Sequence, residues 1–351
     1  GRNVFISRHG RCMNYAWTGP VIFATGFFMN STLSALNPDR VLVVGTTSDY
    51  VQWILDACPD RALFVTDPEI RKKAGEKPPQ PHEELVCPLS DLDAVIHQLT
   101  GHIQHWKQTI TGVACFDCEN MALASRLAQF FKLDYPDVDV IERCRNKHLS
   151  KQIWRQNNVP CPDTEAVDTI KDIFKFMETA PEGLVLKPFF GSGSELVFMC
   201  RNQTEAKNAF HAIQHGLEKR LETPLFRTPG CHPHLMLAEK MISGPEFSCD
   251  FIVENHTVAI IRMTRKIKSA SLPFGTVSGY MIPAHLPENI PQAKLETILR
   301  DGAAALGIQR GICMVDFIVN QNTPVLIEMT PRPGGDCLPQ LLKAAGNLDI
   351  L

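Results

Sequence analysis

The chain has 351 residues, of which 35 are Lys or Arg and 38 are Asp or Glu, so its formal net charge is -3. This length suits two or three compact domains, since one domain usually holds about 100 to 200 residues. Apolar residues make up 44% and charged residues 21%, which excludes the composition of a disordered protein. A nearly neutral chain has no strong field to attract polyanions, so we expect neither nucleic acid nor a membrane as a partner.

Twelve cysteines are spread along the chain, unlike the closely spaced cysteines of a small secreted disulfide protein. We therefore expect a reducing, cytoplasmic location. Cys115 and Cys118 form a C-x-x-C without a second pair at zinc spacing, and we interpret them as packing residues. The apolar stretch 21–28 is shorter than the roughly 20 residues of a bilayer span, so we expect it to be buried. The chain starts at Gly1 without Met, and we expect it to be trimmed.

The first part of the chain alternates short apolar runs with helical patterns. The expected elements are strands 41–44, 63–65, 85–87 and 113–116, and helices around 53–55, 92–106 and 121–131. This β-α-β order predicts a small parallel sheet covered by helices. We therefore expect residues 1–141 to form an N-terminal, doubly wound α/β domain.

The remainder of the chain predicts two α+β lobes, over 142–243 and 244–351. The strands of these lobes are separated by charged helices, and one pair is joined by a tight turn at 254–257, which indicates antiparallel pairing. The expected elements are helices 146–157, 204–221 and 292–306, and strands 184–187, 196–200, 235–241, 246–253 and 258–262.

Two acids, Asp316 and Glu328, each interrupt an otherwise apolar strand near the end of the chain. A three-residue loop at 321–323 would set them opposite each other on one face, with Cβ atoms about 5 Å apart. Facing carboxylates repel and are costly to bury, so the pair predicts a cation, and oxygen ligands favour Mg²⁺ carrying phosphates. The alternative is a structural pair that ties down an arginine such as Arg332.

A second feature is the strand that ends in Lys187 and leads into the loop 191–194, which reads Gly-Ser-Gly-Ser. The lysine supplies a point charge to phosphate oxygens, and a flexible loop with free N–H groups and hydroxyls can close over them. The Walker pattern G-x-x-x-x-G-K-[ST] is absent. The segment therefore predicts a phosphate site of another type, and an ordinary hairpin turn is the alternative.

A third feature is the segment 239–246, in which an apolar strand runs into charged residues and a Gly-Pro turn. Backbone groups at a strand end can read an adenine edge, and an acid such as Glu246 can accept both ribose hydroxyls. The alternative is a solvated turn.

In their order and spacing, these features resemble the ATP-grasp superfamily of carboxylate-amine ligases, from about Glu142 to the end of the chain. The resemblance implies an ATP-grasp fold behind the N-terminal domain, with two lobes that clasp ATP. The roles it implies are ATP phosphates for Lys147 and Lys187, a mobile loop for Ser192, Gly193 and Ser194, adenine for Glu239, Lys240 and Ile242, ribose for Glu246, metal for Asp316, Glu328 and Thr330, and catalysis for Arg332 and Arg265.

Two positions depart from the family pattern. Thr330 stands where the family usually has an asparagine that completes the metal shell, and its hydroxyl is a shorter oxygen ligand. Among ATP-grasp proteins the chain is most similar to L-amino-acid and dipeptide ligases, but those often carry histidine where this chain has Tyr280.

The resemblance implies that ATP converts a substrate carboxylate into an acyl phosphate and that an amine then displaces phosphate. The cofactors would be ATP and Mg²⁺, with Mn²⁺ as a substitute, and the partners would be a small carboxylate and a small amine. Arg332 would stabilise the phosphorylated intermediate, and Arg265 would help to hold phosphate or the acid. Two alternatives stay open: a bicarbonate-activating enzyme of the biotin-carboxylase or carbamoyl-phosphate kind, and a non-catalytic ATP-binding regulator. The oligomeric state, a homodimer included, is open as well.

Overall fold

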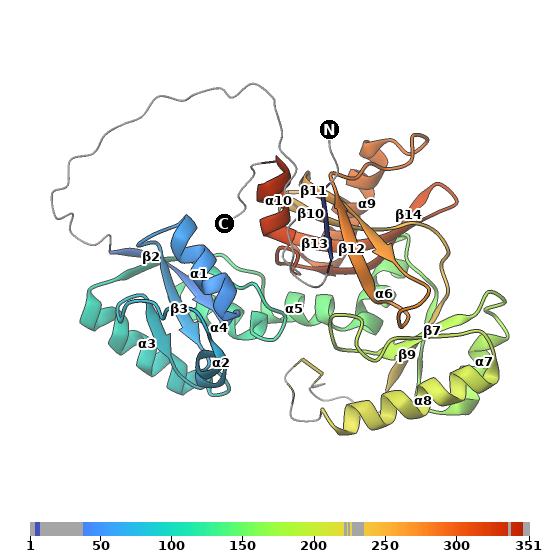
Figure 1. Ribbon diagram of the computed structural model, residues 1–351, viewed down its shortest axis with the longest axis horizontal. Coiled ribbons are helices and arrows are strands. Elements are labelled where there is room, and N and C mark those ends of the chain that lie inside the picture. The colour runs from blue at the N-terminus through green and yellow to red at the C-terminus, as the bar shows by residue number, and fades with distance from the viewer. Residues whose placement is uncertain are drawn as a thin grey trace.

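Residues 4–7, 38–220, 223, 225–226, 235–335 and 338–346 are described by the structure, which is a computed structural model. Three sheets, one in each of three lobes, organise this part of the chain (Figure 1). The apolar stretch 21–28 lies outside the described residues. Within the described ranges, none of the helices has the length and apolar character that a bilayer span requires.

The first lobe is a parallel sheet with helices on both faces. It contains strands β2 (Asp39–Val44), β3 (Ala62–Thr66), β4 (Glu84–Val86) and β5 (Thr109–Ala114), and helices α1 (Ser48–Ala57), α2 (Pro68–Lys73), α3 (Leu92–Trp106) and α4 (Met121–Phe131). The strand order is β4-β3-β2-β5, with all neighbours parallel. Leu42 and Val44 pack with α3 and α4, whereas Val43 packs with α1, because successive side chains point to opposite faces. The predicted doubly wound α/β domain is confirmed.

The second lobe is a four-stranded antiparallel sheet with two helices. It contains β6 (Thr164–Val167), β7 (Leu184–Pro188), β8 (Phe198–Cys200) and β9 (Met236–Lys240), with α7 (Ile170–Met177) and α8 (Gln203–Glu218). The order is β6-β9-β7-β8. Leu184 and Leu186 of β7 pack with Ile173 and Ile213 of the helices, and this contact forms the core of the lobe.

The third lobe is a six-stranded antiparallel sheet with the order β1-β12-β11-β10-β13-β14. Its elements are β1 (Val4–Ser7), β10 (Glu246–Glu254), β11 (Thr257–Lys268), β12 (Val277–Ile282), β13 (Arg310–Asn320), β14 (Thr323–Thr330), α9 (Gln292–Leu306) and α10 (Leu338–Gly346). The predicted turn at 254–257 joins β10 to β11. Residues 4–7, which fall within the predicted first domain, form β1, and β1 pairs with β12, where it covers an otherwise open sheet edge.

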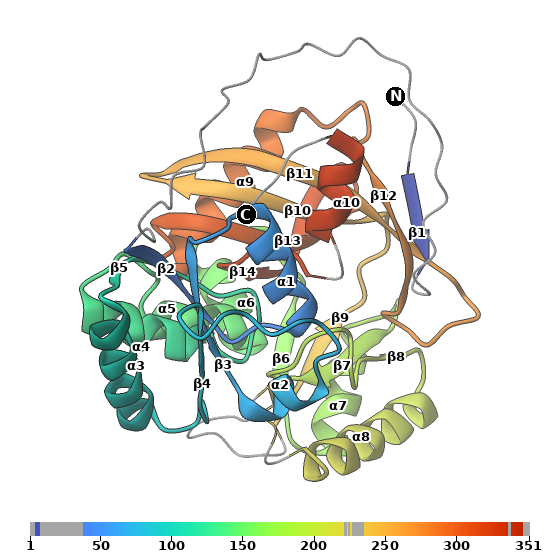
Figure 2. The same ribbon diagram turned by 60° about the vertical axis from the view of Figure 1, so that its left-hand side comes forward.

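Two helices connect the first lobe to the others, α5 (Val138–Arg145) and α6 (Lys147–Gln156). In both views the second lobe lies below the third, with α6 between them (Figure 1 and Figure 2). Asn146 begins α6 by accepting hydrogen bonds from the N–H groups of His148 and Leu149. Trp154, in the last turn of α6, is buried against α9, where its Nε1 donates to the carbonyl of Gly302 at 3.0 Å.

The two faces of the third sheet differ in chemistry. On one face, apolar side chains such as Phe317 join Trp154 and helix α9 in a hydrophobic core. Alternate residues of the same strands point to the other face. That face is polar although buried, and its residues include Ser248, Asp250, Arg262, Thr264 and Asp316. The polar face is the one that meets the second lobe.

Candidate functional site

A cavity of about 440 Å³ lies between the second and third lobes. A second cavity of about 200 Å³ adjoins it and reaches the first lobe, since Cys118 lines it, together with Arg145 at the end of α5. Asp316 and Glu328 line both cavities, as does the glycine-serine loop. The two acids therefore lie where the cavities meet.

Asp316 and Glu328 face each other from β13 and β14, as predicted. Burial raises the pKa of Asp316 to about 6, and the charge of Glu328 acts in the same direction. Burial also acts to raise the pKa of Glu328, but the surrounding lysine ammonium groups, with Lys147 the strongest, together outweigh it and hold this pKa below its usual value. A cation between the two carboxylates would relieve both the burial and the repulsion.

The hairpin that sets this pair differs from the prediction. Its loop comprises only Gln321 and Asn322, both at positive φ, rather than three residues. From a two-residue turn, simple counting would place Ile327 opposite Asp316. A β-bulge after Asp316 takes up one extra residue of β14 and puts Glu328 in that place. The predicted pairing of Asp316 with Glu328 is confirmed, but the predicted loop and the predicted pairing of residue 320 with 324 are wrong.

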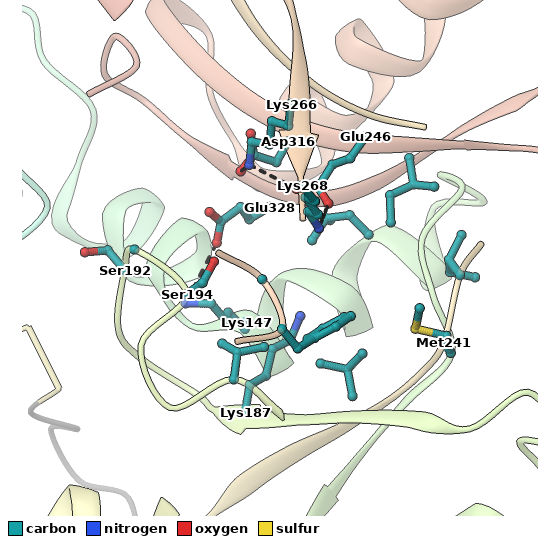
Figure 3. Close-up of a pocket in the computed structure, with 18 of the residues that line it drawn as sticks. Lys147, Lys187, Ser192, Ser194, Met241, Glu246, Lys266, Lys268, Asp316 and Glu328 are labelled. Atoms are coloured by element: carbon teal, nitrogen blue, oxygen red, sulfur yellow. Dashed lines mark hydrogen bonds and ion pairs between the residues drawn. The ribbon is translucent and has the colours of Figure 1, made fainter. Parts of the chain in front are cut away.

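Two lysines of β11 reach acids of β10 and β13, of which β10 is the adjacent strand. Lys266 Nζ donates to Asp316 Oδ2 and lies 3.1 Å from Glu246 Oε1, and Lys268 Nζ donates to Glu246 Oε2. Burial works against the charge of Lys266, but the nearby carboxylates, with Asp316 the strongest, together raise its pKa above the usual value. Figure 3 shows these four residues on one side of the cavity and the lysines of the second lobe and α6 on the other.

From the sequence we named Arg265 and missed Lys266. Counting outward from the turn would place Arg265 opposite Glu246. A β-bulge between β10 and β11 shifts the register by one residue, so Arg265 pairs with the core residue Phe247. Arg265 borders the first cavity, is exposed, and is absent from the described residues that line the second. Lys266 is the basic side chain that meets Asp316.

A signal for this face was present in the sequence. Polar and basic residues alternate with others along β11 at Arg262, Thr264, Lys266 and Lys268. A period of two in polar residues indicates that they share one face of a strand. Arg262 and Thr264 are buried, so the alternation marks a polar buried face rather than a solvated one.

Lys147 and Lys187 reach the first cavity from opposite elements, as the ATP-grasp resemblance implies. Lys147 begins α6, and its Nζ donates to the carbonyl of Gly191 at 2.7 Å and lies 3.9 Å from Glu328 Oε2. Burial lowers the pKa of Lys147. Lys187 lies at the end of β7, and its Nζ is 2.9 Å from Glu239 Oε1. Two ammonium groups are thus available to phosphate at one end of the acid pair.

The loop 191–194 lies between these lysines and the acids. Ser192, Gly193 and Ser194 line both cavities, in agreement with the prediction of a phosphate loop. Gly191 has a φ of +133°, and a Cβ there would lie 2.8 Å from the ring of Phe226. The loop therefore needs glycine at this position for both its conformation and its close packing.

The residues at the strand end that was predicted to bind adenine lie in different places. Ile242 lines the first cavity. Glu239 and Lys240 are absent from the described residues that line it. Glu239 is buried and binds Lys187, while Lys240 pairs with Asp163 at 3.0 Å on another side of β9. Of the three residues predicted to line the adenine pocket, Ile242 borders this cavity, and the adenine roles of Glu239 and Lys240 stay predictions.

Arg332 projects into the second cavity. Its Nη2 and Nε donate to Cys118 Sγ at 3.0 and 3.2 Å, and its Nη1 donates to the carbonyl of Pro333 at 2.7 Å. Cys118 packs in the core of the first lobe, as expected, but it also lines this cavity, which the sequence did not indicate. Because the guanidinium is held by these atoms, the alternative in which the acid pair merely ties down Arg332 is not supported.

The oxygen atoms around Asp316 fit a divalent cation. Asp316 Oδ1 and Thr330 Oγ1 are buried, and neither has a hydrogen-bond partner within the described part of the chain. Buried polar atoms are seldom left without partners. Glu328 precedes Thr330 by two residues on the same face of β14. Together with Asp316, these residues offer three side chains with oxygen ligands where β13 and β14 pair. Oxygen donors are what Mg²⁺ and Mn²⁺ prefer.

The chain is similar to known proteins in sequence and in fold. Residues 180–340 match the model of the ATP-grasp domain. An uncharacterised protein of Sinorhizobium fredii is 25% identical over 262 residues, which cover 75% of this chain and 51% of that protein. A D-alanine–D-alanine ligase of Bordetella avium is 23% identical over 211 residues, which cover 57% of this chain and 61% of the ligase. The matched region thus spans half to three fifths of these relatives.

The fold is similar to that of solved structures over most of the chain. An L-amino acid ligase from Bacillus licheniformis superimposes with a TM-score of 0.67 and 19% identity, over 90% of this chain and 72% of the ligase. A biotin carboxylase domain from Hydrogenobacter thermophilus superimposes with a TM-score of 0.63 and 16% identity, over 90% and 68%. This chain therefore contains an ATP-grasp domain and has the fold of the ATP-grasp proteins.

Proposed function

We propose that this protein is an ATP-dependent ligase that activates a carboxylate as an acyl phosphate and joins it to an amine. The observation that carries the proposal is the position of Asp316 and Glu328, where two cavities meet. One cavity offers lysines and a glycine-serine loop to ATP phosphates, and the other offers Arg332 to an anionic intermediate. Relatives and structural neighbours that are named as amino-acid ligases support this function.

Each part of the nucleotide has residues suited to it. Magnesium, or manganese, would neutralise charge on the transferring phosphoryl group when bound to its three oxygen donors. The proposed contacts are Asp316, Glu328 and Thr330 for the metal, Lys147, Lys187 and the loop 191–194 for the phosphates, Glu246 for the ribose and Ile242 for the adenine.

The reaction has two steps. A carboxylate oxygen of the acid attacks the γ-phosphorus of ATP, the bond to ADP breaks, and an acyl phosphate forms. The amine nitrogen then attacks the acyl carbon, phosphate leaves, and the nitrogen loses a proton. Lys187, Lys266 and Arg332 would stabilise the negative charge in both steps. Closure of the loop 191–194 would keep water from hydrolysing the acyl phosphate.

The test is a phosphate-release screen over pairs of amino acids and small carboxylates, with Asp316→Asn and Glu328→Gln beside the wild type. We expect release that requires both an acid and an amine and that falls at least about 100-fold in each variant, the scale of losing one electrostatic stabiliser. Asp301→Asn is the control, because Asp301 is a half-exposed acid that pairs only with its neighbour Arg300 among the described ion pairs.

Other outcomes would identify another function. Release that depends on bicarbonate would favour the carboxylase alternative, and tight ATP binding without turnover on any pair would favour a regulator. Full activity in both acid variants would contradict the proposed site.

We also propose a cytoplasmic location, small-molecule substrates and domain limits at 141 and 243, with β1 joined to the third lobe through its pairing with β12. Nine cysteines among the described residues are free, which suits a reducing compartment. A homodimer is compatible with these features, and size-exclusion chromatography with light scattering would test it.

A further inference from the structure

A buried cluster of charges lies behind the first cavity, on α6, β7 and β9. Glu239 lies between two lysines, with Lys187 Nζ 2.9 Å from its Oε1 and Lys151 Nζ 3.4 Å from its Oε2. The side chains of Lys151 and Glu239 are 0% and 5% exposed. One carboxylate thus pairs with two ammonium groups and can balance only one of their two charges. Lys187 lines the cavity, whereas Lys151 is absent from its described lining residues.

Lys151 also reaches the third lobe. Its Nζ donates to the backbone carbonyl of Ile327. Ile327 is the residue that the β-bulge of β14 leaves without a partner on β13, and the next residue is Glu328. The ammonium group of Lys151 therefore holds the backbone of β14 at its β-bulge, directly before Glu328.

Burying this charge is costly, so its retention calls for a reason. Burial lowers the pKa of Lys151, and Glu239 only partly offsets the effect. Buried ion pairs often add little stability compared with apolar residues of similar size, and their best-supported use is to select one register or arrangement. The bulge at Ile327 is such a choice, because a shift of one residue would turn Glu328 to the opposite face.

We propose that Lys151 is a positioning residue that holds the bulge at Ile327 and thereby aims Glu328 at the metal, with Glu239 fixing Lys151 and Lys187 at a set spacing. This inference rests on the proposed function only in taking Glu328 as a ligand of the metal that accompanies ATP. Lys151 itself touches neither cavity among their described lining residues.

The test measures binding of a non-hydrolysable ATP analogue by calorimetry, once with Mg²⁺ and once with EDTA. Residues that orient metal ligands typically change metal affinity 10- to 100-fold when mutated. The quantity compared is the ratio of the affinities for the analogue with Mg²⁺ and with EDTA. We expect this ratio to be about 10-fold smaller in Lys151→Met than in the wild type, and the affinity with EDTA to be unchanged. Lys151→Arg, which retains charge and donors, should recover part of the gain.

Arg155→Met is the matched control, since Arg155 lies one turn further along α6 and pairs with Asp163 at 3.9 Å with about half of both side chains exposed. It should bind as the wild type does. An unchanged gain from Mg²⁺ in Lys151→Met, or an equal loss with and without Mg²⁺, would overturn the inference.

If Lys151→Met shows no cooperative thermal unfolding, Lys151→Gln replaces it, because the amide is polar but carries no charge, and its nitrogen ends one atom short of the position of Nζ. The same loss of the Mg²⁺ gain is expected, and a wild-type gain would overturn the inference. A wild type that binds the analogue with Mg²⁺ but turns over no acid-amine pair would refute the proposed ligase and leave the role of Lys151 standing.

Discussion

Gly334 lies where the segment after β14 crosses the buried ion pair of Asp250 and Arg262. Its N–H donates to Asp250 Oδ1 at 3.0 Å, and an added Cβ would lie 2.7 Å from Arg262 Nη2. Both charged side chains are 0% exposed, so neither can move into solvent. We expect Gly334→Ala to lower the free energy of unfolding by about 1–3 kcal/mol, the usual cost of overpacking, as measured by urea denaturation.

Gly335→Ala is the control for this prediction. A Cβ at Gly335 would meet its nearest atom, Arg332 Nη1, at 3.9 Å, which is ordinary contact. It should change stability by less than about 0.5 kcal/mol. Equal effects of the two variants would show that the pair of Asp250 and Arg262 does not constrain the backbone next to Arg332.

At the scale of elements, two β-bulges decide which side chains meet at the site. Both follow a two-residue turn, one at Asn255 and His256 and one at Gln321 and Asn322, and each shifts the pairing by one residue. Without them, period-two counting would put Ile327 opposite Asp316. The bulges therefore place Glu328 opposite Asp316 and put Lys266, rather than Arg265, on the face of the sheet that borders the cavities.

Regular patterns in the sequence were sufficient to predict the regular parts of the fold. The β-α-β order, the antiparallel pair at 246–262 and the acids inside apolar strands all follow from periodicity. The irregular parts did not follow, because a bulge depends on packing and carries no period of its own. Lys266 was missed for this reason, and Asp316 was set opposite Glu328 only because a wrong loop length compensated for an unseen bulge.

The turn between β13 and β14 offers a prediction at the same scale. Both loop residues have positive φ, and Gln321 is a poor choice there, since turns of this kind favour asparagine first and glycine second. We expect Gln321→Asn to raise the free energy of unfolding by about 0.5–1 kcal/mol and Gln321→Val to lower it by about 1 kcal/mol. Urea denaturation measures both, and a reversed order would show that the turn is not limiting.

At the scale of the whole molecule, the site is assembled from all three lobes. Lys187 comes from the second lobe, Asp316 from the third and Cys118 from the first. The contacts of Lys147 with Gly191 and of Arg332 with Cys118 connect segments that are far apart in the chain. Residues this distant in sequence meet only after the lobes pack. The second cavity therefore could not be predicted from a local sequence motif.

A ligand that bridges the lobes should therefore stabilise the molecule as a whole. A ligand that binds only the folded state adds about 2.7 kcal/mol at a concentration 100 times its Kd. We expect a non-hydrolysable ATP analogue with Mg²⁺ to raise the midpoint of thermal unfolding by several degrees, since about 1 kcal/mol shifts it by roughly 2–4 °C in larger domains. EDTA should remove most of the shift, because the phosphates then face Asp316 and Glu328 without a cation between them. Glu328→Gln should bind the analogue with less dependence on Mg²⁺, whereas Asp301→Asn should behave as the wild type. A shift of the same size with EDTA would mean that the acid pair does not hold the metal.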